Sequence, residues 1–155
     1  MRVRYADRGD IPELIRLLFQ VNDVHAKIRP DLFRAGGRKY TPEALEKLLE
    51  DPDRPILVAA EEERLLGYAM CELEYHAGET SRQDMKVLYL DDLCVDEKSR
   101  RSGAGKLLFQ AVRDYARSLG CYEITLNVWQ GNDAARAFYE AMGMTVQKTG
   151  MELIL

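Results

Sequence analysis

Apolar residues recur along the chain with a two-residue spacing in some segments and with the three- and four-residue spacing of helices in others. The first kind of segment is rich in β-branched and aromatic residues and is bounded by polar or glycine-containing links. We expect strands at residues 2–6, 56–60, 65–75, 86–95 and 123–128. The acidic link at 61–64 predicts a hairpin, and the segment from Met144 to Leu155 predicts a second, terminal hairpin.

The first two helices are predicted from apolar stripes that follow capping residues. Asp10 can cap a helix that extends to about His25, with Glu13 placed to complete a capping box. Thr41 precedes a shorter helix that has Pro42 at its first position, where a missing N–H costs nothing. The charged, glycine-containing segment between these helices is expected to be a loop.

The last two helices carry equally clear start and stop signals. One begins at Gly105 and ends before Gly120, and the other follows the capping residue Asn132 and ends before Gly143. The element order is strand, two helices, three strands, helix, strand, helix and two strands. This order predicts an α/β fold of the α+β type, with a mixed sheet covered by helices, in a single domain over residues 1–155.

The composition excludes several classes of protein. Apolar residues make up 46% of the chain and charged residues 31%, which is typical of a globular protein and not of a disordered one. No apolar run is long enough to cross a membrane, and the first ten residues lack the apolar stretch of a secretory signal. We therefore expect a cytoplasmic protein without a membrane partner.

Neither a disulfide framework nor a metal site is expected. The three cysteines, Cys71, Cys94 and Cys121, are an odd number and lie in or beside apolar segments, which predicts reduced, packed thiols. The only histidines are His25 and His76, and no pair of Cys or His residues has the spacing of metal ligands. Metal catalysis is therefore not expected.

The distribution of charge indicates a small anionic ligand. The formal net charge is −4, whereas domains that bind nucleic acid are normally basic, so nucleic acid is not an expected partner. Between Lys98 and Lys106, however, four of nine residues are basic and none is acidic. An isolated basic patch in an acidic chain fits a small polyanion better than a polymer.

The basic patch lies where a predicted strand leads into a predicted helix. The first N–H groups of a helix have no partner inside it, and the helix dipole favours anions at this end. Gly103 and Gly105 lack side chains where a phosphate would touch the backbone. Positive charge can come from Arg100, Arg101 and Lys106. Alone, the pattern fits either an anion site or a flexible, solvated turn.

Two better-known phosphate-binding loops do not fit this turn. A Walker loop needs glycine where Arg100 stands and Ser or Thr where Leu107 stands. A dinucleotide-binding fingerprint needs a third glycine at the position of Leu108. A nucleotide hydrolase is therefore disfavoured.

A second motif begins 27 residues after Gly105 and reads Asn132-x-x-Ala135-x-x-Phe138-Tyr139-x-x-x-Gly143. Together with Arg100-x-x-Gly103-x-Gly105 after a strand that ends at Val95, it resembles the GNAT superfamily of N-acetyltransferases. The order of predicted elements agrees along nearly the whole chain. Sharp motif identity covers roughly residues 87–143.

The resemblance implies a GNAT-like fold and a way of binding acetyl-coenzyme A (acetyl-CoA). The central sheet would be mixed, mostly antiparallel and flanked by about four helices, with strands four and five splayed apart. Acetyl-CoA would lie in this splay as co-substrate, with its pantetheine arm pairing like an extra strand and its pyrophosphate at the glycine turn. The residues that the resemblance implies for this binding are Leu93, Cys94, Val95, Arg100, Arg101, Ser102, Gly103, Ala104, Gly105, Lys106, Asn132 and Tyr139.

Acetyl transfer to an amine needs a base and an acid. An aliphatic ammonium with a pKa of about 10.4 must lose a proton before it attacks. The resemblance implies Asp91 as the base, and the sequence leaves Asp92 or a water chain as alternatives. Tyr89 is a candidate relay, because it is expected on the same face of the strand as Asp91. Tyr139 would approach the thioester sulfur and protonate the departing thiolate. Pleating predicts that Asp91 and Asp92 point to opposite faces of the sheet.

The sequence also predicts how the oxyanion is stabilised and whether the reaction passes through a covalent intermediate. A backbone N–H near Leu93 or Cys94 can stabilise the oxyanion that forms on the thioester. Direct attack in a ternary complex is expected, because no histidine near Cys94 in the sequence could activate it for a covalent intermediate.

The resemblance implies that the region between the first two helices forms a wall of the acceptor site. The candidate substrate-binding residues are His25 and Phe33 of that region, with Asp91 and Asp92 of the strand at 86–95. Carboxylates suit a primary amine, which leaves open a small amine, a polyamine, a lysine side chain or a peptide N-terminus. The competing class is a non-catalytic acyl-CoA-binding sensor or interaction module. Exposed terminal strands favour a homodimer.

Overall fold

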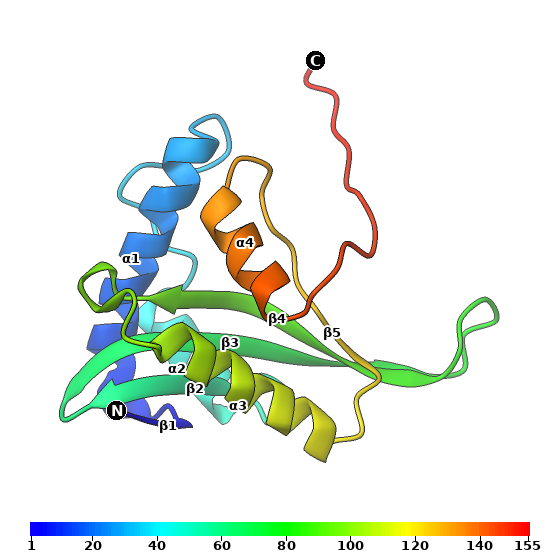
Figure 1. Cartoon of the computed structure of the whole chain (residues 1–155), viewed down its shortest axis with the longest axis horizontal. Helices are drawn as coiled ribbons and strands as arrows, with labels where there is room; N and C mark the ends of the chain where they lie inside the picture. The colour runs from blue at the N-terminus through cyan, green and yellow to red at the C-terminus, as the bar shows by residue number, and fades with distance from the viewer.

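A computed structural model describes all 155 residues as a mixed sheet with helices on both faces (Figure 1). Two short 3-10 turns lie at Arg8–Asp10 and Glu97–Ser99. The strands and helices, in chain order, are β1 (Arg2–Tyr5), α1 (Ile11–Ile28), α2 (Pro42–Glu50), β2 (Ile56–Glu61), β3 (Arg64–His76), β4 (Met85–Val95), α3 (Ala104–Ser118), β5 (Glu123–Thr125) and α4 (Asp133–Ala141).

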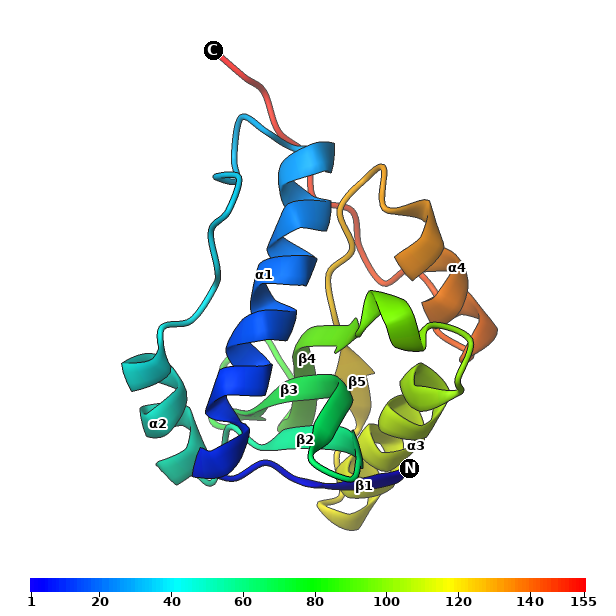
Figure 2. The ribbon, with the colours of Figure 1, turned by 90° about the vertical axis from the view of Figure 1, so that its left-hand side faces the viewer.

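The five strands lie in the sheet in the order in which they occur in the chain. All neighbouring strands are antiparallel except β4 and β5, which are parallel. Figure 2 shows three layers, with α1 and α2 on one face of the sheet and α3 and α4 on the other. The predicted mixed, mostly antiparallel sheet with about four helices is confirmed.

Each face of the sheet has its own apolar core. The cluster under α3 contains Leu88 and Leu90 of β4 with Leu108 and Val112 of α3. The cluster under α1 and α2 contains Leu14, Leu17 and Leu18 of α1, Leu45 of α2, and Tyr68, Met70 and Cys94 of the sheet. The candidate site lies where both clusters reach the end of β4.

The predicted start of the first helix is wrong in its capping residues. Asp10 makes no side-chain bond to the first turn of α1, because its carboxylate is paired with Arg4 and accepts the N–H of Asp7. The capping box is formed by Asp7 and Asp10 around the preceding 3-10 turn. Glu13 instead pairs with Arg16 at 2.8 Å. The other predicted caps, Thr41 and Asn132, both accept backbone N–H groups as expected.

The predicted terminal hairpin is also wrong. Residues Met144 to Leu155 contain no strand, and in Figure 1 they leave the end of α4 and extend past β5 away from the body. A strand needs a neighbour for its N–H and C=O groups, and no segment of the same chain pairs with these residues. The predicted fifth strand is likewise shorter than expected and ends at Thr125.

No helix combines the length and apolar character needed to cross a membrane.

Candidate active site

The glycine turn adopts a conformation that exposes backbone N–H groups. Gly103 precedes α3 with φ 88°, and Arg101 also has a left-handed φ of 65°. Such a φ is uncommon for arginine and carries a strain that functional turns often store. The N–H groups of Arg101, Gly103, Gly105 and Lys106 have no hydrogen-bond partner in the chain.

The charge around this turn is positive and unneutralised. None of Arg100, Arg101 and Lys106 takes part in an ion pair. Four free N–H groups, a helix N-terminus and three free cations lie within seven residues, an arrangement that can hold a small anion. These predicted residues are therefore brought together.

A buried carboxylate that the sequence reading missed fixes the start of this turn. Asp96 directly follows β4 and is completely buried, with Arg64, Arg16 and Gln20 around it. Burial opposes ionisation, but the hydrogen bonds from Arg64 and Gln20 prevail and lower its pKa to about 2. Its side chain also accepts the N–H of Lys98 in the 3-10 turn. The signal in the sequence was an acidic residue at a strand end, a common capping position.

The end of β4 has an open edge on the side of β5. Pairing between the two strands covers only Val87 to Tyr89, and β5 ends there while β4 continues for six residues. This is the predicted splay between strands four and five. Since the Asp96 N–H bonds to Leu66 of β3, alternation turns the backbone groups of Leu93 and Val95 toward the open edge. Those of Cys94 face β3.

A β-bulge in β4 corrects the predicted orientation of the two aspartates. Met70 of β3 pairs with Asp92 and Cys71 pairs with Leu90, so Asp91 is an extra residue without a partner. The bulge reverses the alternation: Leu90 packs under α3 before it, and Leu93 does so after it. Asp91 and Asp92 consequently both lie on the α1 and α2 face. They do not point to opposite faces as pleating alone predicted.

Asp91 is held by neighbours from other segments. Lys39 donates to one carboxylate oxygen at 2.7 Å and the Tyr40 hydroxyl donates to the other at 2.6 Å. Arg54 lies 4.0 Å from the same carboxylate. Burial and the bond to Asp91 raise the pKa of Tyr40. Asp91 is thus part of an ion-pair network that ties the loop before α2 to the sheet.

Asp92 has a different environment one residue further on. Its carboxylate accepts the Tyr68 hydroxyl at 2.6 Å and makes no ion pair. Desolvation raises its pKa to about 6, and the hydrogen bond from Tyr68 and the nearby Lys39 charge only partly offset this effect. A carboxylate with a pKa close to neutral can take up and release a proton under working conditions.

Tyr139 approaches the splay from the opposite face. It lies on α4 against Phe109 and Phe138, with ring centroids 6.2 and 5.3 Å away. Its pKa is raised, first by burial and then by the negative charge of Asp92. The hydroxyl makes no hydrogen bond within the chain, so it is free to contact a ligand.

The side chain of Asn132 caps α4 with its oxygen and keeps its amide nitrogen free to donate a hydrogen bond. Its Oδ1 accepts the Ala135 N–H at 3.3 Å and caps α4, while its amide nitrogen has no partner in the chain. The predicted contact with pantetheine therefore remains open to that nitrogen, at the end of α4 nearest α1 in Figure 2.

The predicted acceptor residues form an aromatic contact with a residue from another element. Phe33 packs on His25 at 5.1 Å and against Trp129 at 5.5 Å, joining the end of α1 to the segment after β5. Burial and the charge of Lys39 lower the pKa of His25. Trp129 was not predicted as a site residue, because nothing in the local pattern around it shows that α1 lies beside it.

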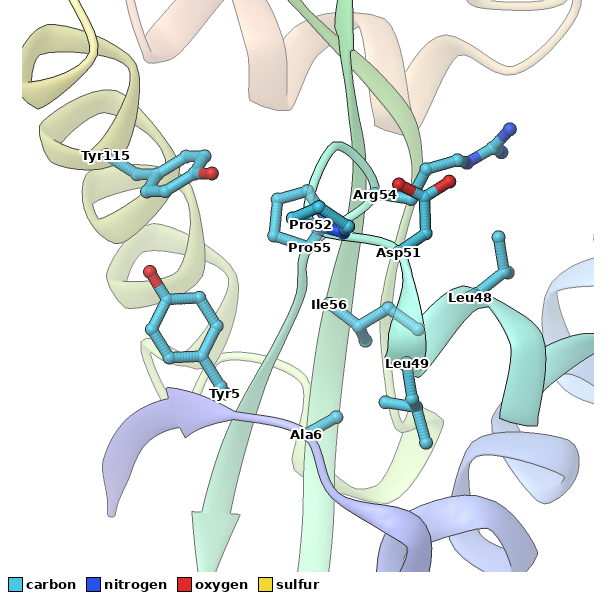
Figure 3. Close-up of a pocket in the computed structure, with 10 residues that line it drawn as sticks. All are labelled: Tyr5, Ala6, Leu48, Leu49, Asp51, Pro52, Arg54, Pro55, Ile56 and Tyr115. Carbon is cyan, nitrogen blue, oxygen red and sulfur yellow. The ribbon is translucent and has the colours of Figure 1, made fainter.

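The hollow drawn in Figure 3 is separate from these residues. It is lined by β1, the end of α2, the start of β2 and Tyr115 of α3. Arg54 belongs to its rim, but its side chain points away from the hollow, toward the Asp91 network (Figure 3). None of the predicted site residues lines this hollow.

Two relatives of known name match most of the chain. YhfO, an uncharacterized N-acetyltransferase of Bacillus subtilis, is 28% identical over 144 residues, which cover 92% of this chain and 89% of the relative. A thialysine N-epsilon-acetyltransferase of Bos taurus is 26% identical over 149 residues, which cover 91% of this chain and 82% of that protein.

A solved structure is similar over the full length. The crystal structure of a mutant of the BH1408 protein from Bacillus halodurans superimposes with a TM-score of 0.95 at 35% identity, covering 100% of this chain and 99% of that one. Residues 21–144 match the acetyltransferase (GNAT) family. Because this match covers well over half of a chain with the fold described above, the chain belongs to the GNAT family and is an acetyl-CoA dependent N-acetyltransferase.

Proposed function

We propose that the protein transfers the acetyl group of acetyl-CoA to a primary amine by direct attack in a ternary complex. One observation carries this proposal: Asp92 and Tyr139 come from opposite faces of the sheet, yet they lie close enough at the open edge of β4 for the negative charge of Asp92 to raise the pKa of Tyr139. A proton acceptor and a proton donor on two sides of an open strand edge suit an amine and a thioester that meet there.

The binding of acetyl-CoA follows from the groups left free on the α3 and α4 side. The pyrophosphate accepts the N–H groups of Gly103, Gly105 and Lys106, with charge from Arg100 and Arg101. The pantetheine arm lies along the open edge at Leu93 and Val95. The amide nitrogen of Asn132 donates to the same arm. This arrangement leaves the acetyl group at the bulge.

The proton transfers involve first Asp92 and then Tyr139, which lie on opposite faces of the sheet. Asp92, directly or through a water molecule, accepts a proton from the ammonium, and the free amine attacks the thioester carbon. The oxyanion is stabilised by the Leu93 N–H, since the Cys94 N–H faces β3. When the C–S bond breaks, the Tyr139 hydroxyl gives its proton to the thiolate. Tyr139 is then reprotonated by the second proton that leaves the nitrogen.

A covalent route through Cys94 is disfavoured by its surroundings. The Sγ lies 3.6 Å from the carbonyl oxygen of Leu17 in the core, and burial raises the pKa of the thiol to about 12. A thiol in this state supplies little thiolate near neutral pH.

The acceptor side suits an aliphatic ammonium. Lys39 of the chain already places such a group 2.7 Å from Asp91 and 5.7 Å from the Tyr40 ring centroid. An acceptor with the same chemistry would find the same partners and the aromatic wall of Phe33 and Trp129. The bovine relative, named for N-epsilon acetylation of thialysine, supports an amine acceptor of this kind.

The test is release of CoA thiol from acetyl-CoA with a panel of acceptors. The panel pairs each aliphatic primary amine, including a polyamine and a lysine peptide, with its alcohol of equal length. We expect saturable thiol release with at least one amine and none with the alcohols. Saturable acetyl-CoA binding without release for any amine, or transfer to an alcohol, would contradict the proposal.

A further inference from the structure

The segment between α1 and α2 carries a primary amine to the acceptor side. Residues 29–41 form no helix or strand, and Figure 2 shows them running back along α1 to reach α2. The side chain of Lys39 extends from this segment to Asp91, where its Nζ lies 2.7 Å from Oδ1. Of the lysines in the chain, Lys39 alone takes part in an ion pair. Its amine therefore lies where the proposed function requires an acceptor amine.

The chain on both sides of Lys39 is fixed to neighbouring elements. On the α1 side, the side-chain amide of Asn22 donates to the carbonyl oxygen of Arg34 at 2.8 Å. On the α2 side, the Tyr40 hydroxyl donates to the second oxygen of the Asp91 carboxylate, and Thr41 caps α2. The Lys39 side chain is 46% exposed, and an ion pair exposed to this extent contributes little stability by itself. These anchors therefore hold the amine in place, and the ion pair alone does not.

The ammonium of Lys39 also acts on the other candidate acceptor residues. The pKa of His25 is lowered by burial and then by the Lys39 charge. Desolvation raises the pKa of Asp92, and the same charge opposes this effect together with the hydrogen bond from Tyr68. One amine thus lies within electrostatic range of His25 at the end of α1 and of both aspartates of β4. No other lysine has this relation to the acceptor residues.

We propose that Lys39 is an acetylation site of the enzyme itself, modified within the same chain by the acetyl-CoA bound at the splay. The inference rests on the proposed function, because it uses the same acetyl group, base and acid. The proposed path of pantetheine leaves the acetyl group at the bulge, and Asp91 is the bulge residue that Lys39 contacts. The lysine amine and the acetyl group are therefore brought to the same residue.

The transfer step consumes only acetyl-CoA. Asp92, directly or through a water molecule, accepts a proton from the Lys39 ammonium, and Nζ forms a bond to the thioester carbon. As the C–S bond breaks, the Tyr139 hydroxyl gives its proton to the thiolate and receives the second proton that leaves the nitrogen. The products are Nε-acetyl-Lys39, the CoA thiol and one proton.

Acetylation of Lys39 would open the acceptor side to other amines. The amide has no charge and cannot keep the ion pair, so the Asp91 carboxylate becomes available to an external ammonium. Lys39→Gln, which imitates the acetylated side chain, should therefore lower KM for a cationic amine about fivefold. Lys39→Arg keeps the positive charge and should leave this KM close to its natural value.

The test is incubation of the full chain with isotopically labelled acetyl-CoA and no added amine, followed by mass spectrometry of its peptides. We expect the label at Lys39, at a rate that saturates with acetyl-CoA and does not depend on the concentration of the chain. Lys27 and Lys47 are exposed and form no ion pair, so they report spontaneous acetylation in the same sample. Their labelling should be at least about tenfold slower and proportional to acetyl-CoA.

Variants and added amines separate this inference from the proposed function. Lys39→Arg should take up no label at position 39 and still acetylate an added amine, whereas Lys47→Arg, the matched control, should be labelled at Lys39 like the natural chain. Labelling of Lys39 no faster than that of Lys27, or at a rate that rises with chain concentration, would overturn the inference while transfer to added amines upholds the proposed function. Acetylation of neither Lys39 nor any added amine would overturn both.

Discussion

The two sides of the candidate site are built in different ways. The acetyl-CoA side consists mainly of backbone N–H groups from consecutive residues, positioned by Gly103 and the start of α3. The acceptor side consists of side chains from distant segments, with Lys39 and Tyr40 on Asp91 and Tyr68 on Asp92. Changes on the first side should alter the affinity for acetyl-CoA, whereas changes on the second should alter proton transfer and the use of the amine.

Tyr139 lies between the two sides, and its loss should have the largest effect. Tyr139→Phe keeps the ring against Phe109 and Phe138 but removes the proton donor. We expect turnover to fall by roughly 10² to 10⁴ with little change in KM for acetyl-CoA. Steady-state kinetics measure this effect, and Tyr115→Phe on α3 serves as the matched control. Unchanged turnover with the best amine would remove Tyr139 from the role of acid.

Substitutions of the two adjacent aspartates can separate proton transfer from amine binding on the acceptor side. Asp92→Asn keeps an acceptor for the Tyr68 hydroxyl but cannot take up a proton, so kcat should fall by about 10². Asp91→Asn removes the partner of Lys39 and should mainly raise KM for the amine. The reverse pattern, a larger loss of kcat in the Asp91 variant, would return the role of base to Asp91.

The dependence of kcat/KM on pH gives an independent test of whether Asp92 or Asp91 is the base. Because the pKa of Asp92 is raised to about 6, the carboxylate is protonated and inactive as a base below that pH and ionised above it. The value of kcat/KM should therefore rise through about pH 6 in the natural chain and in the Asp91→Asn variant. The Asp92→Asn variant should lack this rise. A rise that persists in it would assign the titration to another group.

The glycine turn should show the smallest of these effects and a different kind. Gly103 has a φ of 88°, where a side chain costs about 1 kcal/mol, so Gly103→Ala should raise KM for acetyl-CoA about fivefold. Gly105→Ala is the matched control, since its added Cβ meets Phe138 and Val95 at ordinary contact distances of 3.4 Å. Equal effects of the two changes would show that the left-handed conformation does not position the turn.

The sequence predicts the acetyl-CoA side better than the acceptor side for a physical reason. A turn and a helix start are local, so Gly103, Gly105 and Asn132 could be placed from their neighbours in the chain. The contacts of Asp91 with Lys39 and Tyr40 span about fifty residues and leave no local signal. Only the register of β3 against β4 reveals the bulge.

The same limit applies to the ends of the chain. The apolar residues between Met144 and Leu155 led to a predicted hairpin that the structure does not contain, because pattern alone does not say whether a segment finds a partner strand. The capping box at the start of α1 was misplaced by one turn because Arg4, from another element, competes for Asp10. The local sequence therefore predicts these elements correctly, except where a contact with a residue distant in the sequence decides the structure.

The bulge at Asp91 also constrains how the length of β4 can vary. Removing Asp91 would restore regular pairing, since Leu90 and Asp92 already pair with Cys71 and Met70. Leu93 and Val95 would stay on the α3 face and Cys94 on the α1 face. Removing Leu93 instead would move Cys94 and Val95 to opposite faces, so the two apolar cores would exchange members. The bulge is thus the place in this part of β4 where the chain can lose a residue without mixing the two cores.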